Sequence, residues 1–267
     1  MQKNTVMEFS TLKIQLGESV AWVSLNRPEV HNAMNDVMIQ ELTEVFDWLD
    51  CRDDVRVIML KGNGKSFCAG ADLAYMRDVA KKGYDANYAD AEKLSRLFRA
   101  IYFCRKVVVC VVQGACMGGA NGLISASDIV IADKGAFFAF PEVLSGLIPA
   151  TISPFVVQRC GMSASRELML TGRRFSAEEA KAIGIVNVLA DDVPAAESAC
   201  LEQLMKASPE AVASCKRLLQ SVAHMDDPEA PVFELTSAMI AASRASADAQ
   251  EGTTAFLEKR KPSWCQQ

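Results

Sequence analysis

Two glycine-containing turns and one isolated carboxylate are the residues of this chain best suited to chemistry. The turns are Ala69-Gly70-Ala71-Asp72 and Gly118-Gly119-Ala120-Asn121-Gly122, and the carboxylate is Glu142, which follows Pro141. Backbone N–H groups in such turns can hold a developing oxyanion, and a carboxylate can move a proton. The combination indicates chemistry that places negative charge on a carbonyl oxygen.

Each turn follows an apolar, β-branched run that predicts a buried strand, at residues 55–60 and at residues 107–112. Ligands of α/β sheets sit at the carboxyl ends of strands, and a glycine-rich turn there exposes free N–H donors. One donor from each turn could hold the same oxygen. The alternative, that the glycines only serve tight turns, is the better reading of either turn alone but not of the pair.

The surrounding pattern predicts an α/β fold. Strands are expected at residues 12–16, 20–25, 129–132 and 136–139, and helices after the N-cap Asn35, at residues 91–103 and from Gly119 to Ser127. Alternating strands and helices favour right-handed crossovers and a largely parallel sheet. Beyond Pro149 the pattern becomes helical, with starts at Ser163 and Ser176 and helical periodicity through residues 192–207, 209–223 and 231–256.

Composition narrows the class of protein. The 267 residues are 50% hydrophobic with a formal net charge of -5, which suits a single core domain and argues against a general nucleic-acid surface. Nine cysteines without CxxC spacing indicate free thiols in a reducing compartment and no metal site. We expect a cytoplasmic protein, because neither a secretory signal nor a membrane-spanning apolar run is visible.

With its two turns and the Pro141-Glu142 segment, the sequence resembles the crotonase (enoyl-CoA hydratase/isomerase) superfamily over nearly its full length. The matching segments are Ser24-Leu25-Asn26-Arg27-Pro28-Glu29, Phe67-Cys68-Ala69-Gly70-Ala71-Asp72-Leu73, Met117-Gly118-Gly119, Ser127-Asp128-Ile129, Phe140-Pro141-Glu142, Leu170-Thr171-Gly172 with Ala180, and Glu251-Gly252 with Phe256-Leu257-Glu258-Lys259-Arg260. The resemblance implies a ββα spiral core over residues 1–200 and a helical trimerisation region over residues 201–267. It also implies a homotrimer or homohexamer, an acyl-CoA substrate and no separate cofactor.

The resemblance further implies roles for individual residues. The N–H groups of Ala71 and Gly119 would hold the thioester oxygen, and Glu142 would be the catalytic acid/base. The remaining candidates would contact the substrate or its CoA part: Arg27, His31, Lys65, Ser66, Ala69, Asp72, Leu73, Gly118, Asn121, Gly122, Thr151, Ser153, Phe256 and Lys259. Phe256 and Lys259 would reach the site from the C-terminal helix, sometimes of a neighbouring subunit. Each cation could equally be an ordinary surface residue.

Gly122 is the main departure from the family pattern. Two-glutamate hydratases carry a glutamate at this position, so Glu142 is the one carboxylate expected here. A single glutamate can move a proton between two carbons, which makes an isomerase, or can run a syn hydration. Alternatively another side chain contributes: Asn121 could orient a water, and Tyr75, Tyr84 and Tyr88 are further candidates.

The segment from Gly146 to Val157 resembles the methylglutaconyl-CoA hydratase branch of leucine catabolism and the related isoprenoid glutaconyl-CoA enzymes. We therefore expect a lyase that hydrates a branched glutaconyl-type ester. Gly122 would make room for the branch, while Thr151 and Ser153 would donate to the distal carboxylate. The alternatives are a Δ3,Δ2-enoyl-CoA isomerase and a non-catalytic acyl-CoA-binding protein. His224, in a polar turn, is expected to have no role.

Overall fold

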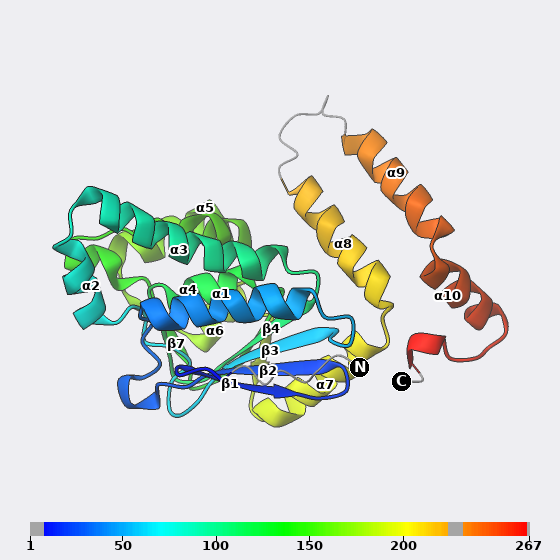
Figure 1. Ribbon diagram of the computed structural model, residues 1–267, viewed down its shortest axis with the longest axis horizontal. Coiled ribbons are helices and arrows are strands. Elements are labelled where there is room, and N and C mark those ends of the chain that lie inside the picture. Colours follow the sequence, from blue (N-terminus) through cyan, green and yellow to red (C-terminus); the bar gives the residue numbers. More distant parts are fainter. Residues whose placement is uncertain (1–7, 224–231, 266–267) are drawn as a thin grey trace.

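The computed structural model describes residues 8–223 and 232–265. Its centre is a six-stranded sheet in the order β1-β2-β3-β4-β6-β9, and every neighbouring pair is parallel except β1 and β2 (Figure 1). The strands are β1 (Leu12–Leu16), β2 (Val20–Leu25), β3 (Val57–Gly62), β4 (Val107–Val112), β6 (Ile129–Asp133) and β9 (Val188–Ala190). The predicted α/β class with a largely parallel sheet is confirmed.

A second, three-stranded sheet carries the turn at Gly118. It has the order β5-β7-β8 and consists of β5 (Ala115–Met117), β7 (Phe137–Ala139) and β8 (Arg174–Ser176). The sequence did not predict β5 or β8, because each has only three residues and no periodicity to read. Their pairing depends on segments far apart in the chain, since β8 joins β7 through Phe138 and Phe175.

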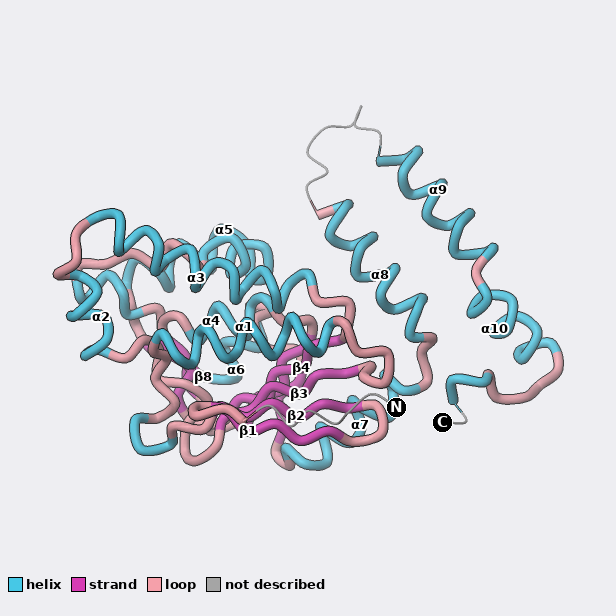
Figure 2. The backbone as a smooth tube through the Cα atoms, in the orientation of Figure 1, coloured by secondary structure: helices cyan, strands magenta, loops and turns pink. Residues whose placement is uncertain are grey.

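Helices pack against both faces of the large sheet. On one face lie α1 (Asp36–Asp50), α3 (Tyr84–Phe103), α4 (Ala120–Ala126) and α5 (Ser153–Thr171), and on the other lies α7 (Val193–Met205) (Figures 1 and 2). The side chains of the strands alternate between two apolar clusters. Val23 and Val108 face the α1 side, whereas Val57 and Val109 face the α7 side.

Local sequence signals explain several helix boundaries. The side chain of Asn35 accepts a hydrogen bond from the N–H of Met38 at 3.0 Å, as its predicted N-cap role requires. Ser176 likewise caps α6 (Ala177–Ala182). Gly161, whose φ of 77° is not helical, divides α5 into two helical segments, and the second begins close to Ser163 as predicted. The sequence also did not predict α2 (Leu73–Ala80), which Asp72 caps.

The C-terminal part consists of α8 (Pro209–Val222), α9 (Val232–Ala245), α10 (Ala247–Leu257) and the short helix η3 (Ser263–Cys265). These helices extend away from the sheet (Figure 1). Ser246 caps α10 and divides the predicted helix of residues 231–256 in two. Arg56 attaches this part to the core, because its guanidinium donates to the carbonyl oxygens of Trp264, Met205 and Ala207 at 3.1, 3.2 and 2.5 Å.

Within the described ranges, no helix combines the length and the apolar character needed to cross a membrane.

Candidate active site

The two turns predicted from the sequence lie against each other. Cys68 and Cys116 form a parallel β-bridge, in which the N–H of Cys68 donates to Ala115 at 3.0 Å and that of Met117 donates to Cys68 at 3.1 Å. Gly70 has a φ of +99°, and a Cβ there would lie 2.9 Å from the carbonyl oxygen of Met117. Only glycine permits this backbone conformation and this close approach.

Ala71 in the first turn and Gly119 in the second are among the described residues whose N–H groups are unused. Met34 forms backbone hydrogen bonds with the residues on either side of Ala71. Its N–H donates to the carbonyl of Gly70, and its carbonyl accepts from the N–H of Asp72, both at 2.8 Å. The N–H groups of Ala71 and of Gly119, which directly precedes α4, have no acceptor in the part of the chain that the structure describes. Two free donors on touching turns suit a single oxyanion.

Glu142 lies beside the second turn. It belongs to the short helix η2 (Pro141–Ser145), and its Oε1 would be 3.1 Å from a Cβ at Gly118, whose φ is +51°. Its Oε2 is buried and has no hydrogen-bond partner among the described residues. Burial raises the pKa of Glu142 above its ordinary value of 4.5. An unpaired carboxylate with a raised pKa is poised for proton transfer.

The side chain of Asn121 holds the second turn in place. Its side chain is fully buried, and its Nδ2 donates to the carbonyl oxygens of Ala139 at 2.8 Å and Gly118 at 3.1 Å. It therefore connects the second turn to β7. These contacts occupy the Nδ2 of Asn121, and its roles in binding substrate or orienting a water stay predictions.

Gly122 departs from expectation. A Cβ there would lie 2.4 Å from Cζ of Phe98 and 2.6 Å from Cγ2 of Ile152. The predicted room for a substrate branch is absent, because these two side chains fill it. The same packing excludes a second carboxylate at this position, so Glu142 has no acidic partner there.

Arg27 and Asp72 brace the first turn. The Nη2 of Arg27 is 3.1 Å from Oδ2 of Asp72, and its Nη1 donates to the carbonyl of Ala33 at 2.6 Å. Burial acts to raise the pKa of Asp72, but the bond from Arg27 and the N–H groups of Tyr75 and Ala74 lower it overall. Arg27 is thus paired with Asp72 across the first turn, and its phosphate contact stays a prediction.

The loop that contains His31 packs on the loop before the first turn. Nδ1 of His31 is 3.2 Å from Oγ of Ser66, and its carbonyl accepts from the N–H of Ala69 at 2.9 Å. Asn32, which sequence reasoning missed as a positioning residue, is fully buried and donates to the carbonyls of Asn63, Ser66 and Phe67. Nothing in the local sequence distinguishes it from a loop asparagine. Lys65 is exposed beside them.

Most of the remaining predicted residues are exposed or bonded to neighbours other than Glu142. Leu73 is exposed at the start of α2, and Thr151 and Ser153 flank Ile152 at the start of α5, where the Ser153 hydroxyl donates to Ala150 at 2.9 Å. The hydroxyl of Tyr75 donates to Asp90, whereas Tyr84 and Tyr88 are 80% and 55% exposed. Their contacts do not connect these three tyrosines to Glu142. His224 lies outside the described residues.

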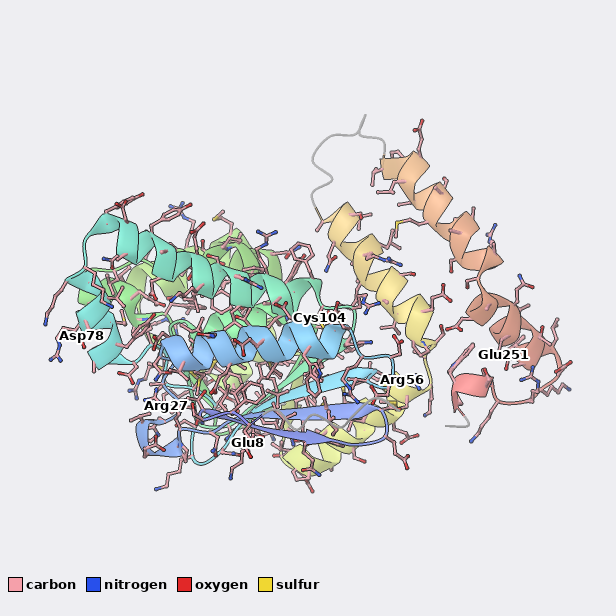
Figure 3. All side chains as sticks on the ribbon, in the orientation of Figure 1. Glu8, Arg27, Arg56, Asp78, Cys104 and Glu251 are labelled. Carbon is pink, nitrogen blue, oxygen red and sulfur yellow. The ribbon has the colours of Figure 1, made fainter. Side chains whose placement is uncertain are left out.

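Phe256 and Lys259 are not near Arg27 in this chain. Helix α10, marked by Glu251, lies at the opposite end of the molecule from Arg27 (Figure 3). Phe256 is 82% exposed there, and Lys259 follows α10 with a positive φ of 55°. A direct role at the site of the same chain is therefore not supported by this arrangement.

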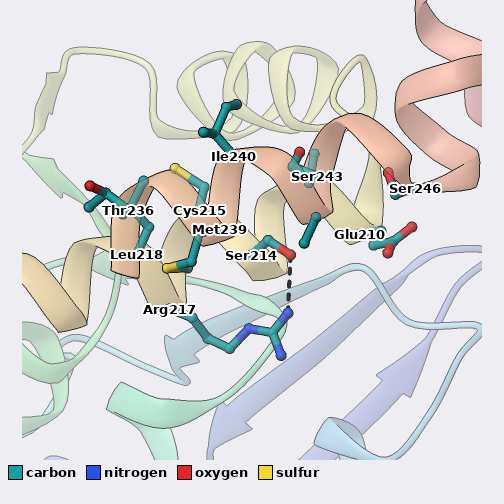
Figure 4. A pocket seen from close by; sticks show the side chains of 12 residues that line it. Glu210, Ser214, Cys215, Arg217, Leu218, Thr236, Met239, Ile240, Ser243 and Ser246 are labelled. Carbon is teal, nitrogen blue, oxygen red and sulfur yellow. Dashed lines mark hydrogen bonds between the residues drawn. The ribbon is translucent and has the colours of Figure 1, made fainter. Parts of the chain in front are cut away.

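A cavity of about 620 Å³ lies between α8 and α9 (Figure 4), and Glu142 is not part of its lining. Its lining includes Ser214, Cys215, Met239 and Ser243 but none of the predicted site residues. Within the described residues, no group of three or more His, Cys, Asp or Glu side chains is arranged to hold a metal.

The chain is similar in fold and in sequence to known proteins. A crystal structure of an enoyl-CoA hydratase from Shewanella pealeana has 40% identity and a TM-score of 0.93, and the match covers 96% of this chain and 97% of that one. The enoyl-CoA hydratase ACTT6 of Alternaria alternata is 33% identical, with 82% of this chain and 73% of the relative covered. The mevalonyl-coenzyme A hydratase sidH of Aspergillus fumigatus is 32% identical, with 91% and 90% covered. Residues 15–267 match the enoyl-CoA hydratase/isomerase family, and the chain belongs to that family.

Proposed function

We propose that the protein is a lyase that hydrates an α,β-unsaturated acyl-CoA with Glu142 as the sole acid/base. The observation that carries this proposal is the unpaired, buried Oε2 of Glu142 beside a turn that offers a free N–H group. The family and the named hydratases among the relatives support an enoyl-CoA hydratase.

The geometry supports one sequence of steps. The N–H groups of Ala71 and Gly119 hold the thioester oxygen and lower the energy of the enolate. Ionised Glu142 takes a proton from water while the water oxygen bonds to the β-carbon, and the C=C electron pair moves toward the thioester oxygen. Protonated Glu142 then returns the proton to the α-carbon and the carbonyl re-forms. Coenzyme A is part of the substrate, and these steps need no further cofactor.

A Δ3,Δ2-enoyl-CoA isomerase is the second candidate. The packing at Gly122 leaves no space for a second carboxylate, so Glu142 acts alone. This supports an isomerase as well as it supports a hydratase, because one carboxylate suffices to move a proton between two carbons. A non-catalytic acyl-CoA-binding protein is less well supported, since Glu142 carries the cost of a buried unpaired carboxylate.

For the substrate we propose a β-branched glutaconyl-type ester such as 3-methylglutaconyl-CoA. The resemblance of residues 146–157 to that branch supports this, and one relative is named as a hydratase of mevalonyl-CoA, whose acyl group is branched at the β-carbon. Thr151 and Ser153 at the start of α5 would donate to the distal carboxylate. Ser153 would have to exchange its present bond to Ala150.

We propose that the protein assembles as a homotrimer or homohexamer through residues 201–267. The described C-terminal helices expose large apolar side chains, among them Leu219, Phe233, Ile240, Phe256 and Leu257. In an assembly, Phe256 and Lys259 would reach the CoA part of a neighbouring subunit's substrate.

The test is to incubate the purified protein with 3-methylglutaconyl-CoA, crotonyl-CoA and a 3-enoyl-CoA in separate reactions. Loss of enoyl absorbance together with a gain of one water in mass supports hydration, and preference for the first ester supports the branched substrate. A shifted double bond without added water would replace hydration with isomerisation. Binding of an ester without any turnover would indicate a non-catalytic acyl-CoA-binding protein.

A further inference from the structure

The volume beside Gly122 is filled by side chains from two other elements. A Cβ at Gly122 would be 2.4 Å from Cζ and 2.6 Å from Cε1 of Phe98, which belongs to α3, and 2.6 Å from Cγ2 of Ile152, which precedes α5. The exposed fractions of Phe98 and Ile152 are 0% and 1%. These residues thus occupy the position in which a side chain at residue 122 would stand.

Phe98 has little freedom to leave this position. Its ring meets that of Phe155 edge-on, with 6.0 Å between centroids and 67° between planes, and Phe155 in turn lies 5.4 Å from the ring of Tyr102. Interiors packed in this way resist displacement of a single ring. Phe98 therefore forms a fixed wall on the side of α4.

This wall lies close to where the reacting carbons would be. Gly119 and Gly122 are three residues apart, so they share a face of α4 and are separated by about 4.5 Å along its axis. The N–H of Gly122 donates to the carbonyl of Gly119 at 3.0 Å. If the N–H of Gly119 holds the thioester oxygen, the β-carbon lies two bonds beyond the carbonyl carbon, within about one helical turn of Gly122.

We propose that Phe98, supported by Ile152, is a specificity-determining residue that limits the size of the substituent on the β-carbon of the acyl group. The proposal rests on the acyl-CoA site described above. Because Phe98 and Ile152 fill the space beside Gly122, a branch longer than methyl would have to displace the ring. The same ring keeps position 122 free of any side chain and so keeps the centre a single-carboxylate site.

Two saturated esters that cannot be hydrated test the proposal. They are 3-methylpentanoyl-CoA and 3-ethylpentanoyl-CoA, which have the same main chain and differ by one methylene in the branch. Isothermal titration calorimetry should give the wild type a Kd about tenfold or more lower for the methyl-branched ester, the scale of discrimination for one methylene in an apolar pocket. In Phe98→Leu this ratio should fall to near one.

Phe46→Leu is the matched control. Phe46 is equally buried but belongs to α1, so its variant should lose stability and keep the wild-type Kd ratio. Thermal unfolding of Gly122→Ala, Phe98→Leu and the double variant tests the steric contact independently of any ligand. Gly122→Ala should lower Tm, and Phe98→Leu should recover part of that loss.

The outcomes separate the two proposals. A wild type that hydrates enoyl-CoA while its Kd ratio is the same in Phe98→Leu overturns the role of Phe98 and leaves the hydratase intact. A ratio that falls in Phe98→Leu without any turnover by the wild type supports the role of Phe98 and removes the hydratase. If neither ester binds the wild type, the role of Phe98 fails, and turnover of enoyl-CoA alone decides whether the hydratase stands.

Discussion

At the scale of single residues, Glu142 is suited to proton transfer because burial raises its pKa more than the hydrogen bond from its own backbone N–H lowers it. Oε2 has no hydrogen-bond partner in the described chain, and burial raises the pKa of the carboxyl group. Asp72 shows the opposite arrangement, since its bonds to Arg27 and to backbone N–H groups lower its pKa and keep it ionised. Glu142 is therefore suited to proton transfer, and Asp72 is suited to holding the first turn in place.

Glu142→Gln should reduce hydration by at least about 100-fold while CoA-ester binding stays within a few-fold of wild type, because general acid–base catalysis contributes on that scale. Kinetics with the best ester and calorimetry with its saturated analogue measure the two effects. Glu29→Gln, at an exposed position, is the control. Near-full activity of Glu142→Gln would refute the assigned role.

The pH dependence of kcat/KM should show an acid limb controlled by Glu142. The ionised form takes the proton from water, so activity should rise with pH through a midpoint above 4.5, in the direction that burial shifts the pKa. An acid limb at or below pH 4.5 would contradict this environment.

The same shift predicts an effect on stability. The folded-state pKa of Glu142 exceeds the unfolded value, so its favourable contribution is complete below pH 4.5 and is lost as pH rises through the folded pKa. Glu142→Gln should therefore have a higher Tm than wild type at pH 7, and the difference should vanish below pH 4.5. A variant less stable than wild type at pH 7 would show that the carboxylate has a stabilising partner.

At the scale of elements, the site depends on how short segments are held rather than on long helices or strands. Asn121 joins the turn at Gly118 to β7, and Asn32 joins the loop at His31 to residues 63–67. Both amides satisfy carbonyl groups inside the protein, and leaving a buried carbonyl without its donor costs about 1–3 kcal/mol. These asparagines position the turns without touching the proposed substrate.

Asn121→Ala should lower kcat more than it raises KM, because the N–H of Gly119 would lose its fixed direction while the CoA contacts remain. Stability should also fall, by about 1–3 kcal/mol, because two side-chain hydrogen bonds are lost while the carbonyls of Gly118 and Ala139 keep their backbone donors. Steady-state kinetics and urea unfolding provide the two readouts. Asn87→Ala, which removes an amide from the surface of α3, should change neither kinetic constant. An unchanged kcat in Asn121→Ala would exclude a positioning role.

At the scale of the whole molecule, the core around the sheet buries several cysteine thiols, whereas the C-terminal helices expose more of their side chains. Cys68, Cys110 and Cys116 are fully buried, and burial raises the pKa of Cys68 and Cys110 to about 12. Thiols in such surroundings are inert toward electrophiles, because the thiolate is the reactive form. Cys51 and Cys215 are exposed instead.

Iodoacetamide should therefore label Cys51 rapidly in the folded protein and leave Cys68, Cys110 and Cys116 unmodified until urea unfolds it. Cys215 lines the cavity between α8 and α9, so its labelling reports whether a second subunit covers those helices. Peptide mass spectrometry after short exposure identifies the labelled sites. Loss of activity upon labelling of Cys116 in the native protein would contradict the buried site.

The sequence by itself determined the features that depend on neighbours along the chain. The alternation of strands and helices predicted the parallel sheet, and residues 12–16, 20–25 and 107–112 are strands with those bounds. The side chain of Asn35 caps α1 because capping is local. The two turns and Glu142 could be named from their residue types, and the resemblance to the family supplied their proposed roles.

Only the tertiary structure decided what surrounds those residues. The sequence does not indicate that Phe98 fills the space beside Gly122 or that the amide of Asn121 donates to β7. It also does not indicate that Arg27 pairs with Asp72, which is 45 residues away in the chain. The physical reason is that volume and hydrogen-bond partners are set by segments distant in the chain, and no local pattern encodes which segments meet. The position of Gly122 could be read from the sequence, but the volume available to it depends on the packing of α3 and α5 against α4.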